Sequence, residues 1–196
     1  MREMVKMVIV LTVLSAVSGG SLAWVRDITA AGIEKQELLV VKGPAIKEIL
    51  EGATNDPLND RFKIKDADTE ISFYVGVFDG EPNVVVFETF GKGFGGDLGL
   101  MVAVNIKDDK IHGAGVTTHS ETPGVGSRAQ TDPAFAAQFK GMPAIDTFKV
   151  KTDGGQVDAV SGATVTSRGV SSALTDAGKL YQRLKPQISE NLKGFK

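Results

Sequence analysis

The chain contains no cysteine among its 196 residues, and this absence excludes several functions at once. Without thiols it forms no disulfides, binds no cysteine-ligated iron–sulfur cluster and has no thiolate nucleophile. Only two histidines are present, and no carboxylates stand beside them at metal-ligand spacing, so we expect no metal site. A chain without cysteine is compatible with either side of a membrane and suits an oxidising, extracytoplasmic compartment.

An excess of charge of one sign is also missing. The chain has 22 Lys and Arg against 24 Asp and Glu, a net charge of −2, and no basic run stands out. Nucleic acid is therefore not an expected partner. A G-x-G-x-x-G pattern occurs at residues 91–96, but residues 98–106 after it have strand character, whereas a dinucleotide-binding fold requires a helix there. We interpret residues 91–96 as a glycine-rich turn between strands, and no nucleophile-elbow pattern is found.

The longest uncharged run lies near the N-terminus. Residues 7–25 are about long enough to cross a bilayer, with Trp24 at the end of the run and Arg2 and Lys6 before it. This arrangement predicts a transmembrane anchor with residues 1–6 in the cytoplasm and the rest of the chain outside. A secretory signal cleaved after residues 21–23 is the alternative. Both interpretations place most of the chain outside the cytoplasm.

Hydrophobic periodicity predicts an α+β fold. Residues 26–69 are expected to form a helical connector and residues 70–196 one domain. Within these segments the pattern predicts short helices at 45–50 and 133–139, strands at 71–78, 83–89, 98–106 and 111–118, short strands at 148–150 and 157–160, and a C-terminal helix with apolar residues from 170 to 184. The predicted architecture is a single N-terminal transmembrane helix followed by a mostly antiparallel sheet and a C-terminal helix.

Small and hydroxyl-bearing residues occupy positions 158–167, immediately before the apolar positions of the last predicted helix. Backbone N–H groups and the positive end of the helix dipole meet at such a helix start and favour a phosphate. Gly162 and Ala163 leave room for a bulky group, and the hydroxyls of Thr164 and Thr166 are within reach. An ordinary Ser/Thr helix cap would have the same composition and is the alternative.

The same segment carries a family resemblance. Asp158-Ala159-Val160-Ser161-Gly162-Ala163-Thr164 is similar to the flavinylation motif of FMN-binding domains, in which a threonine holds FMN through a phosphoester. Residues 93–96, residues 111–118 and the block His119-Ser120-Glu121-Thr122-Pro123-Gly124-Val125-Gly126 resemble the G subunit of Rnf ion-translocating electron-transport complexes. The C subunit of the sodium-pumping NADH:quinone reductase is a more distant relative. The resemblance covers nearly the whole chain and is densest from Gly91 to Leu184.

This resemblance implies the residues of a flavin site. It implies FMN esterified to Thr164, with Thr166 as the fallback acceptor, and a basic residue, Lys149 or Lys151, near the flavin or its phosphate. As the alternative to a plain turn, it also implies that the glycine-rich loop at residues 91–96 packs near the flavin. Glu121 or the Thr122 backbone is expected to hydrogen-bond the polar edge of the ring. The other implied cofactor-binding residues belong to the motif or to the loop that lines the ring, where family members commonly have leucine in place of Val125: Asp158, Ser161, Gly162, Ala163, Val165, Pro123, Gly124 and Val125.

The resemblance also implies a role and partners. The chain is expected to relay electrons within a complex that couples ferredoxin and NAD redox chemistry to ion translocation. Its partners would be the other Rnf subunits, including integral membrane proteins, and a flavin transferase that uses FAD and magnesium. It would be a single-pass protein of the cytoplasmic (inner) membrane, with the FMN domain outside. The alternatives are an extracytoplasmic binding module with noncovalent or no flavin, and a secreted scaffold protein with a cleaved signal.

Overall fold

The computed structural model describes residues 1–66 and 69–195 of the chain. The chain forms two compact units, Met1–Val40 and Val41–Lys196.

The first unit is mainly one helix, α1 (Arg2–Glu37), which continues into a short π-helix, η1 (Leu38–Lys42). The part from Arg2 to Ala30 is long and apolar enough to cross a membrane, which agrees with the predicted anchor. Apolar side chains lie on all sides of this segment and are exposed, a pattern that suits lipid rather than water. The helix extends well beyond the predicted span at residues 7–25.

The second unit is built on a five-stranded antiparallel sheet in which each strand pairs with the next along the chain, in the order β1-β2-β3-β4-β5. Asp79 and Gly80 both have positive φ and form the tight turn between the second and third strands, as the Asp-Gly pair predicts. The strands are β1 (Arg61–Asp66), β2 (Thr69–Phe78), β3 (Glu81–Lys92), β4 (Asp97–Asn105) and β5 (Lys110–Thr118). The antiparallel sheet predicted from the sequence is confirmed.

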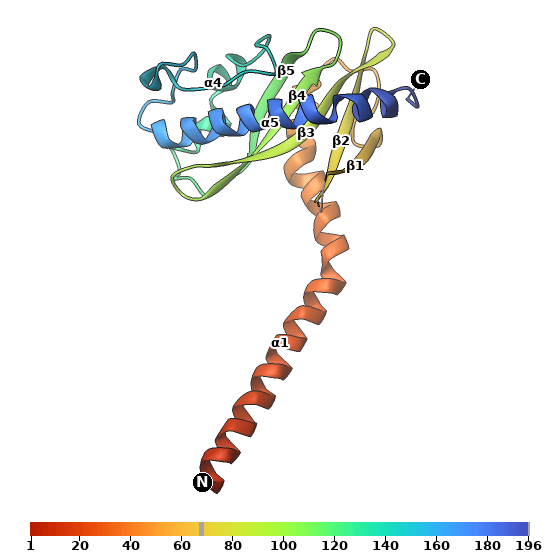
Figure 1. Cartoon of the computed structure of the whole chain (residues 1–196). Helices are drawn as coiled ribbons and strands as arrows, with labels where there is room; N and C mark the ends of the chain where they lie inside the picture. Colours follow the sequence, from red (N-terminus) through yellow and green to blue (C-terminus); the bar gives the residue numbers. More distant parts are fainter. Residues whose placement is uncertain (67–68, 196) are drawn as a thin grey trace. The chain divides into compact units, whose positions relative to one another are not determined.

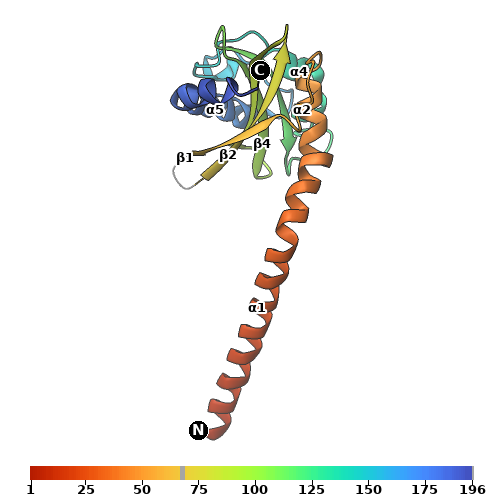
Figure 2. The same cartoon turned by 90° about the vertical axis from the view of Figure 1, so that its right-hand side faces the viewer.

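Helices cover the sheet from both sides. The long helix α5 (Thr164–Leu192) lies across one face, and the short helix α2 (Gly43–Ile49) lies on the other (Figures 1 and 2). Ile49 packs over glycines of β5, which give the helix a close approach. On the α5 face, Phe87 from the sheet meets the apolar stripe of α5, whose members are fully buried: Val170, Leu174 and Tyr181. The predicted C-terminal helix therefore has the predicted buried face.

Between β5 and α5 the chain is mostly irregular, with α3 (Arg128–Thr131), α4 (Pro133–Ala137) and the 3-10 turn η2 (Lys151–Asp153). The strands expected at 148–150 and 157–160 are wrong, because only an isolated bridge joins Val150 to Val157. This bridge is parallel, and the few residues between its members are too short for the crossover connection that a parallel ladder requires. Conversely, β1 lies in a segment predicted to be connector, although Phe62 and Ile64 alternate with charged residues as in a strand.

A charged network fastens the β4–β5 turn to α5. The Asp109 carboxylate accepts hydrogen bonds from Lys185 Nζ (2.6 Å) and the Tyr181 hydroxyl (2.6 Å). These hydrogen bonds, that of Lys185 first, lower the pKa of Asp109 below its usual value. Because the folded-state pKa is depressed, the stabilisation exists above the usual carboxyl pKa and is lost as the pH falls through the folded-state pKa.

We therefore predict that Asp109→Asn lowers the free energy of unfolding at neutral pH by about 1 kcal/mol, since the network is half-exposed. The difference from wild type should shrink between neutral pH and a strongly acid pH, because the Asp109 carboxylate becomes protonated as the pH falls through its lowered pKa. Urea unfolding at the two pH values measures it. A difference that persists in acid would assign the loss to the shape of the turn rather than to the carboxylate.

Candidate functional site

Three segments meet at the start of α5: the tip of the β3–β4 hairpin (residues 91–97), the loop after β5 (residues 119–127) and the motif segment (residues 158–166). Glycines bring α5 close to β3. A Cβ at Gly169 would lie 2.5 Å from the carbonyl oxygen of Lys92, and a Cβ at Gly91 would overlap the Gly169 carbonyl. The sequence therefore lets the first turns of α5 lie directly against the end of β3.

The motif turns sharply into the helix. Gly162 has φ +79°, a conformation that favours glycine, and Thr164 is the first helical residue. Ala163 occupies the N-cap position and makes no side-chain cap, so the alternative of an ordinary Ser/Thr cap is wrong. Ser167 instead holds the turn from inside the helix, since its hydroxyl accepts from Val160 N–H (2.9 Å) and donates to Ala163 O (3.0 Å). The helix start has no side-chain cap to compete with a ligand for its backbone N–H groups.

The two threonines of the motif have different surroundings. Thr166 is 2% exposed, and its hydroxyl donates a hydrogen bond to Oε2 of Glu121. Thr164 is half-buried, and among the described residues its hydroxyl has no hydrogen-bond partner. Val165, between them, is 44% exposed. Of the two hydroxyls, that of Thr166 is bound within the protein and that of Thr164 is not, as far as the described residues go.

The Glu121 side chain is directed into the protein. It is buried, with Oε1 accepting from the Gly95 N–H (2.8 Å) and Oε2 accepting from Thr166. Both oxygens of the carboxylate are therefore engaged by the chain itself. Glu121 brings together the hairpin tip, the loop after β5 and the start of α5.

The remaining predicted residues of the loop lie at the surface: Thr122, Pro123, Gly124 and Val125 are all exposed. Gly124, with φ +73°, donates its N–H to Ser127 Oγ (2.8 Å) and so shapes the turn. Val125 lies next to the motif, because a Cβ at Gly162 would be 3.8 Å from Val125 Cγ1. The structure thus brings the exposed loop and the motif side by side.

The surface around Thr164 fits a flavin. Val125, Val165 and Phe94 of the hairpin tip all belong to the three segments and are at least 42% exposed, which offers apolar contacts to a planar ring. Gly162 leaves space beside the backbone, and the uncapped helix start suits a phosphate. The ring, the tail and the phosphate of a flavin therefore each have complementary groups within this small area.

A hydrogen-bonded chain that the sequence analysis missed supports the loop. Nδ1 of His119 accepts from the Glu121 N–H (3.1 Å), so its Nε2 carries the proton and donates to Gln130 Oε1 (3.1 Å). Gln130 in turn donates to the Thr117 carbonyl (3.0 Å). The position of His119 two residues before Glu121, inside the block that carries the family resemblance, was the available signal, but no hydrogen-bonding role was assigned to it. Its role in the structure is to hold the loop.

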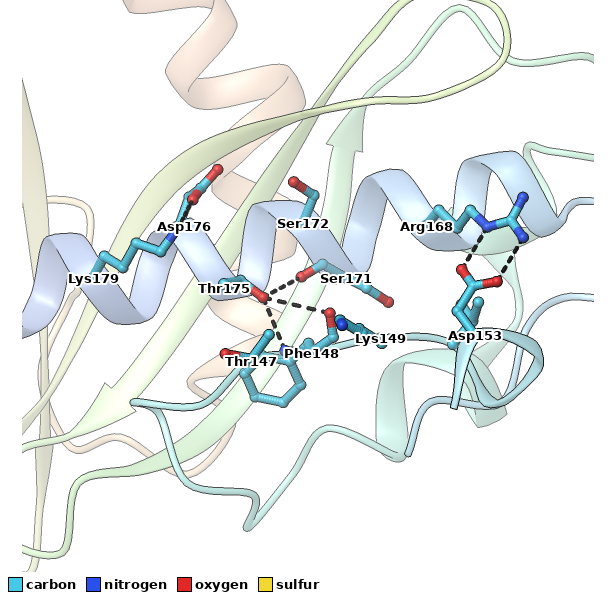
Figure 3. A pocket seen from close by; sticks show the side chains of 11 residues that line it. Thr147, Phe148, Lys149, Asp153, Arg168, Ser171, Ser172, Thr175, Asp176 and Lys179 are labelled. Carbon is cyan, nitrogen blue, oxygen red and sulfur yellow. Dashed lines mark hydrogen bonds and ion pairs between the residues drawn. The ribbon is translucent and has the colours of Figure 1, made fainter. Parts of the chain in front are cut away.

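Charged pairs surround the motif. Asp158 is exposed and pairs with Lys151 (2.7 Å), so one of the two predicted lysines does approach the motif. Arg168, one turn into α5, binds Asp153 through two 2.7 Å hydrogen bonds (Figure 3). That hydrogen bonding lowers the pKa of Asp153 and raises the pKa of Arg168. The first pair closes residues 151–158 on themselves, and the second joins them to the first turns of α5.

A groove of about 490 Å³ runs beside this part of α5. Lys149, the other predicted basic residue, lines it (Figure 3). Thr175 joins its two walls, because its hydroxyl accepts from Phe148 N–H (2.9 Å) and donates to Ser171 O (3.0 Å). Among the residues that the structure describes, no three His, Asp or Glu side chains gather where they could hold a metal ion.

The chain is similar to known proteins. The FMN-binding domain family matches residues 93–179, which include the hairpin tip, the loop after β5 and the motif. The C subunit of the Na⁺-translocating NADH-quinone reductase from Parabacteroides distasonis, a crystal structure, is 30% identical with a TM-score of 0.49. The likeness covers 57% of this chain and 61% of that one.

Two curated relatives extend over most of the chain, and each is named as the G subunit of an ion-translocating oxidoreductase complex. The protein from Methanosarcina acetivorans is 36% identical over 90% of this chain and 93% of its own. The protein from Cereibacter sphaeroides is 32% identical over 92% of this chain and 85% of its own. With this identity over nearly full length, the chain belongs to the family of G subunits of Rnf-type ion-translocating oxidoreductase complexes, which carry an FMN-binding domain.

Proposed function

We propose that this protein is a membrane-anchored electron carrier whose FMN is attached through its phosphate to Thr164. The observation that carries this proposal is the contrast between the two threonines. Thr164 stands at an uncapped helix start with a free hydroxyl, whereas Thr166 is buried and bound to Glu121. When bound, FMN supplies the electron-transfer chemistry, and the chain supplies the tether, the orientation and the surroundings.

The attachment itself belongs to a flavin transferase. The Oγ of Thr164 forms the new P–O bond, the pyrophosphate bond of FAD breaks, AMP leaves, and the hydroxyl proton passes to a base of the transferase. The described residues of this chain hold no metal cluster that would bind magnesium for such a step. Once formed, the phosphoester lies at the positive end of the α5 dipole. The groups of the motif thus serve recognition and then seat the phosphate.

The carrier works inside a complex that couples ferredoxin and NAD redox chemistry to ion translocation, with integral membrane subunits as neighbours. The relatives are subunits of an ion-translocating oxidoreductase complex, which supports this role. We place the FMN domain on the extracytoplasmic side, because Arg2 and Lys6 precede the apolar part of α1. A covalent link suits that side, since a lost cofactor would be hard to replace there.

Peptide mapping tests the attachment. The full chain is co-expressed with a flavin transferase and digested with trypsin, which releases Thr152–Arg168 with both motif threonines. We expect this peptide to carry one FMN, and fragmentation to locate it on Thr164. An unmodified peptide, with the transferase active on a control substrate, would contradict the proposal. Flavin retained by the native protein but lost on denaturation would then support a noncovalent binding module.

The lack of cysteine makes the orientation directly measurable. We predict that Lys193→Cys, at an exposed position after α5, reacts with a membrane-impermeant maleimide in intact spheroplasts. Met4→Cys should react only after the membrane is broken, because it lies at the cytoplasmic end of α1. The wild-type chain, which has no cysteine to react with the maleimide, is the negative control for both variants. The reverse labelling pattern would place the FMN domain in the cytoplasm.

A further inference from the structure

Glu121 occupies a space that glycines keep open. A Cβ at Gly126 would lie 2.5 Å from Oε2 of Glu121, and a Cβ at Gly93 would overlap Oε1. Neither glycine has a positive φ, so the requirement at both positions is for space rather than for backbone freedom. The carboxylate is thus enclosed by the hairpin tip on one side and by its own loop on the other.

No lysine or arginine pairs with Glu121 among the residues described in the structure. Its carboxylate is balanced by two donors, the Thr166 hydroxyl and the Gly95 N–H, which come from different segments. Burying a carboxylate is costly unless such donors are in place, and an apolar side chain would fill the same space at lower cost. The carboxylate adds specific hydrogen bonds that an apolar side chain cannot make. Each of its oxygens binds one neighbouring segment and fixes the position of that segment.

The spacing of the threonines explains how the motif serves this contact. Side chains two residues apart on a helix are separated by about 200° around its axis, so they lie on nearly opposite sides. Thr166 therefore faces inward to Glu121 while Thr164 faces the surface. One threonine fastens the start of α5 to the surrounding loops, and the other carries the free hydroxyl.

We propose that Glu121 is a positioning residue that acts through Thr166 and Gly95 to set how the flavin ring is held. The inference rests on the proposed function, attachment of FMN at Thr164. Glu121 does not touch the ring itself. It fixes the loop that exposes Val125 and the tip that exposes Phe94, so the apolar surroundings of the ring depend on it.

A matched pair at position 166 tests this role in the full chain co-expressed with a flavin transferase. Thr166→Val removes the hydroxyl and keeps the shape, whereas Thr166→Ser keeps the hydroxyl. We expect both variants to carry covalent flavin. Only Thr166→Val should lose flavin fluorescence anisotropy and shift the flavin midpoint potential, and Thr166→Ser should match wild type. The Gly95 amide should exchange its hydrogen about tenfold faster in Thr166→Val, because the carboxylate that accepts from it has lost the hydrogen bond at its other oxygen.

The outcomes separate the two proposals. Wild-type anisotropy and potential in Thr166→Val overturn the positioning role and leave the attachment at Thr164 standing. A wild-type chain without covalent flavin overturns the proposed function, and with it the effect on the ring. If Thr166→Val does not fold by circular dichroism, Thr166→Ala replaces it, because it removes the same hydroxyl with a smaller side chain. Thr166→Ala should fold and shift the potential, and an unshifted potential would overturn the role.

Discussion

Thr164→Ala is expected to abolish covalent flavin while leaving the protein folded. On a denaturing gel, the wild-type chain co-expressed with a flavin transferase should give a fluorescent band and the variant a dark one. The effect is all-or-none, because a phosphoester cannot form without the hydroxyl. The fold should tolerate the change: among the described residues the Thr164 hydroxyl has no partner, and alanine favours a helix more than threonine does. We expect stability to change by less than about 0.5 kcal/mol.

Three control variants make the result specific. Thr164→Ser keeps a hydroxyl at the helix start and should keep a fluorescent band. Thr166→Ser should remain fluorescent, because it leaves the acceptor Thr164 unchanged and keeps the hydroxyl that binds Glu121. A fluorescent Thr164→Ala chain would move the attachment to Thr166, and Thr164→Ala with Thr166→Ala together would then be dark. If wild type and Thr164→Ala are both dark beside an active transferase, the flavin is not covalent.

Much of the fold follows from local pattern. Strands β2 to β5 and the helix α5 carry clear periodicities, and their predicted positions agree closely with the structure. The errors came where a pattern was short. Val150 and Val157 look like parts of strands, but the few residues between them leave room for only a single parallel bridge. Strand β1 has the right alternation, yet it is short and rich in charge, like a connector.

The site was predictable as a set of residues but not as an arrangement. The motif and the loop after β5 identified Thr164 and Glu121, and the structure brings both segments to the start of α5. The sequence left Thr166 as a second acceptor, because distance along a chain does not show which side chain faces inward. Glu121 or the Thr122 backbone was expected at the polar edge of the ring, and the structure adds that the Glu121 carboxylate binds Gly95 and Thr166, which are 26 and 45 residues away. Such pairings depend on packing, and no local pattern indicates them.

Gly169→Ala is expected to lower the free energy of unfolding more than Asp109→Asn or Thr164→Ala does. Helix propensity alone predicts the opposite, since alanine in place of glycine inside a helix stabilises by about 1 kcal/mol. Here the new Cβ would lie 2.5 Å from the Lys92 carbonyl oxygen, a backbone atom that cannot move without shifting β3. Overpacking of this kind commonly costs about 1–3 kcal/mol, and we expect a net loss of about 2 kcal/mol.

Thermal unfolding of the full chain in detergent measures the effect, with Ser172→Ala as the matched control. Ser172 is exposed on the same helix, so the control introduces the same residue with only the propensity gain. The two variants should shift the melting temperature in opposite directions. Because the contact between β3 and α5 places Thr164 among the surrounding loops, Gly169→Ala should also lower the fraction of chains that acquire FMN. A melting temperature raised in both variants would mean that β3 yields readily, and the close approach of α5 would then not be what holds the site together.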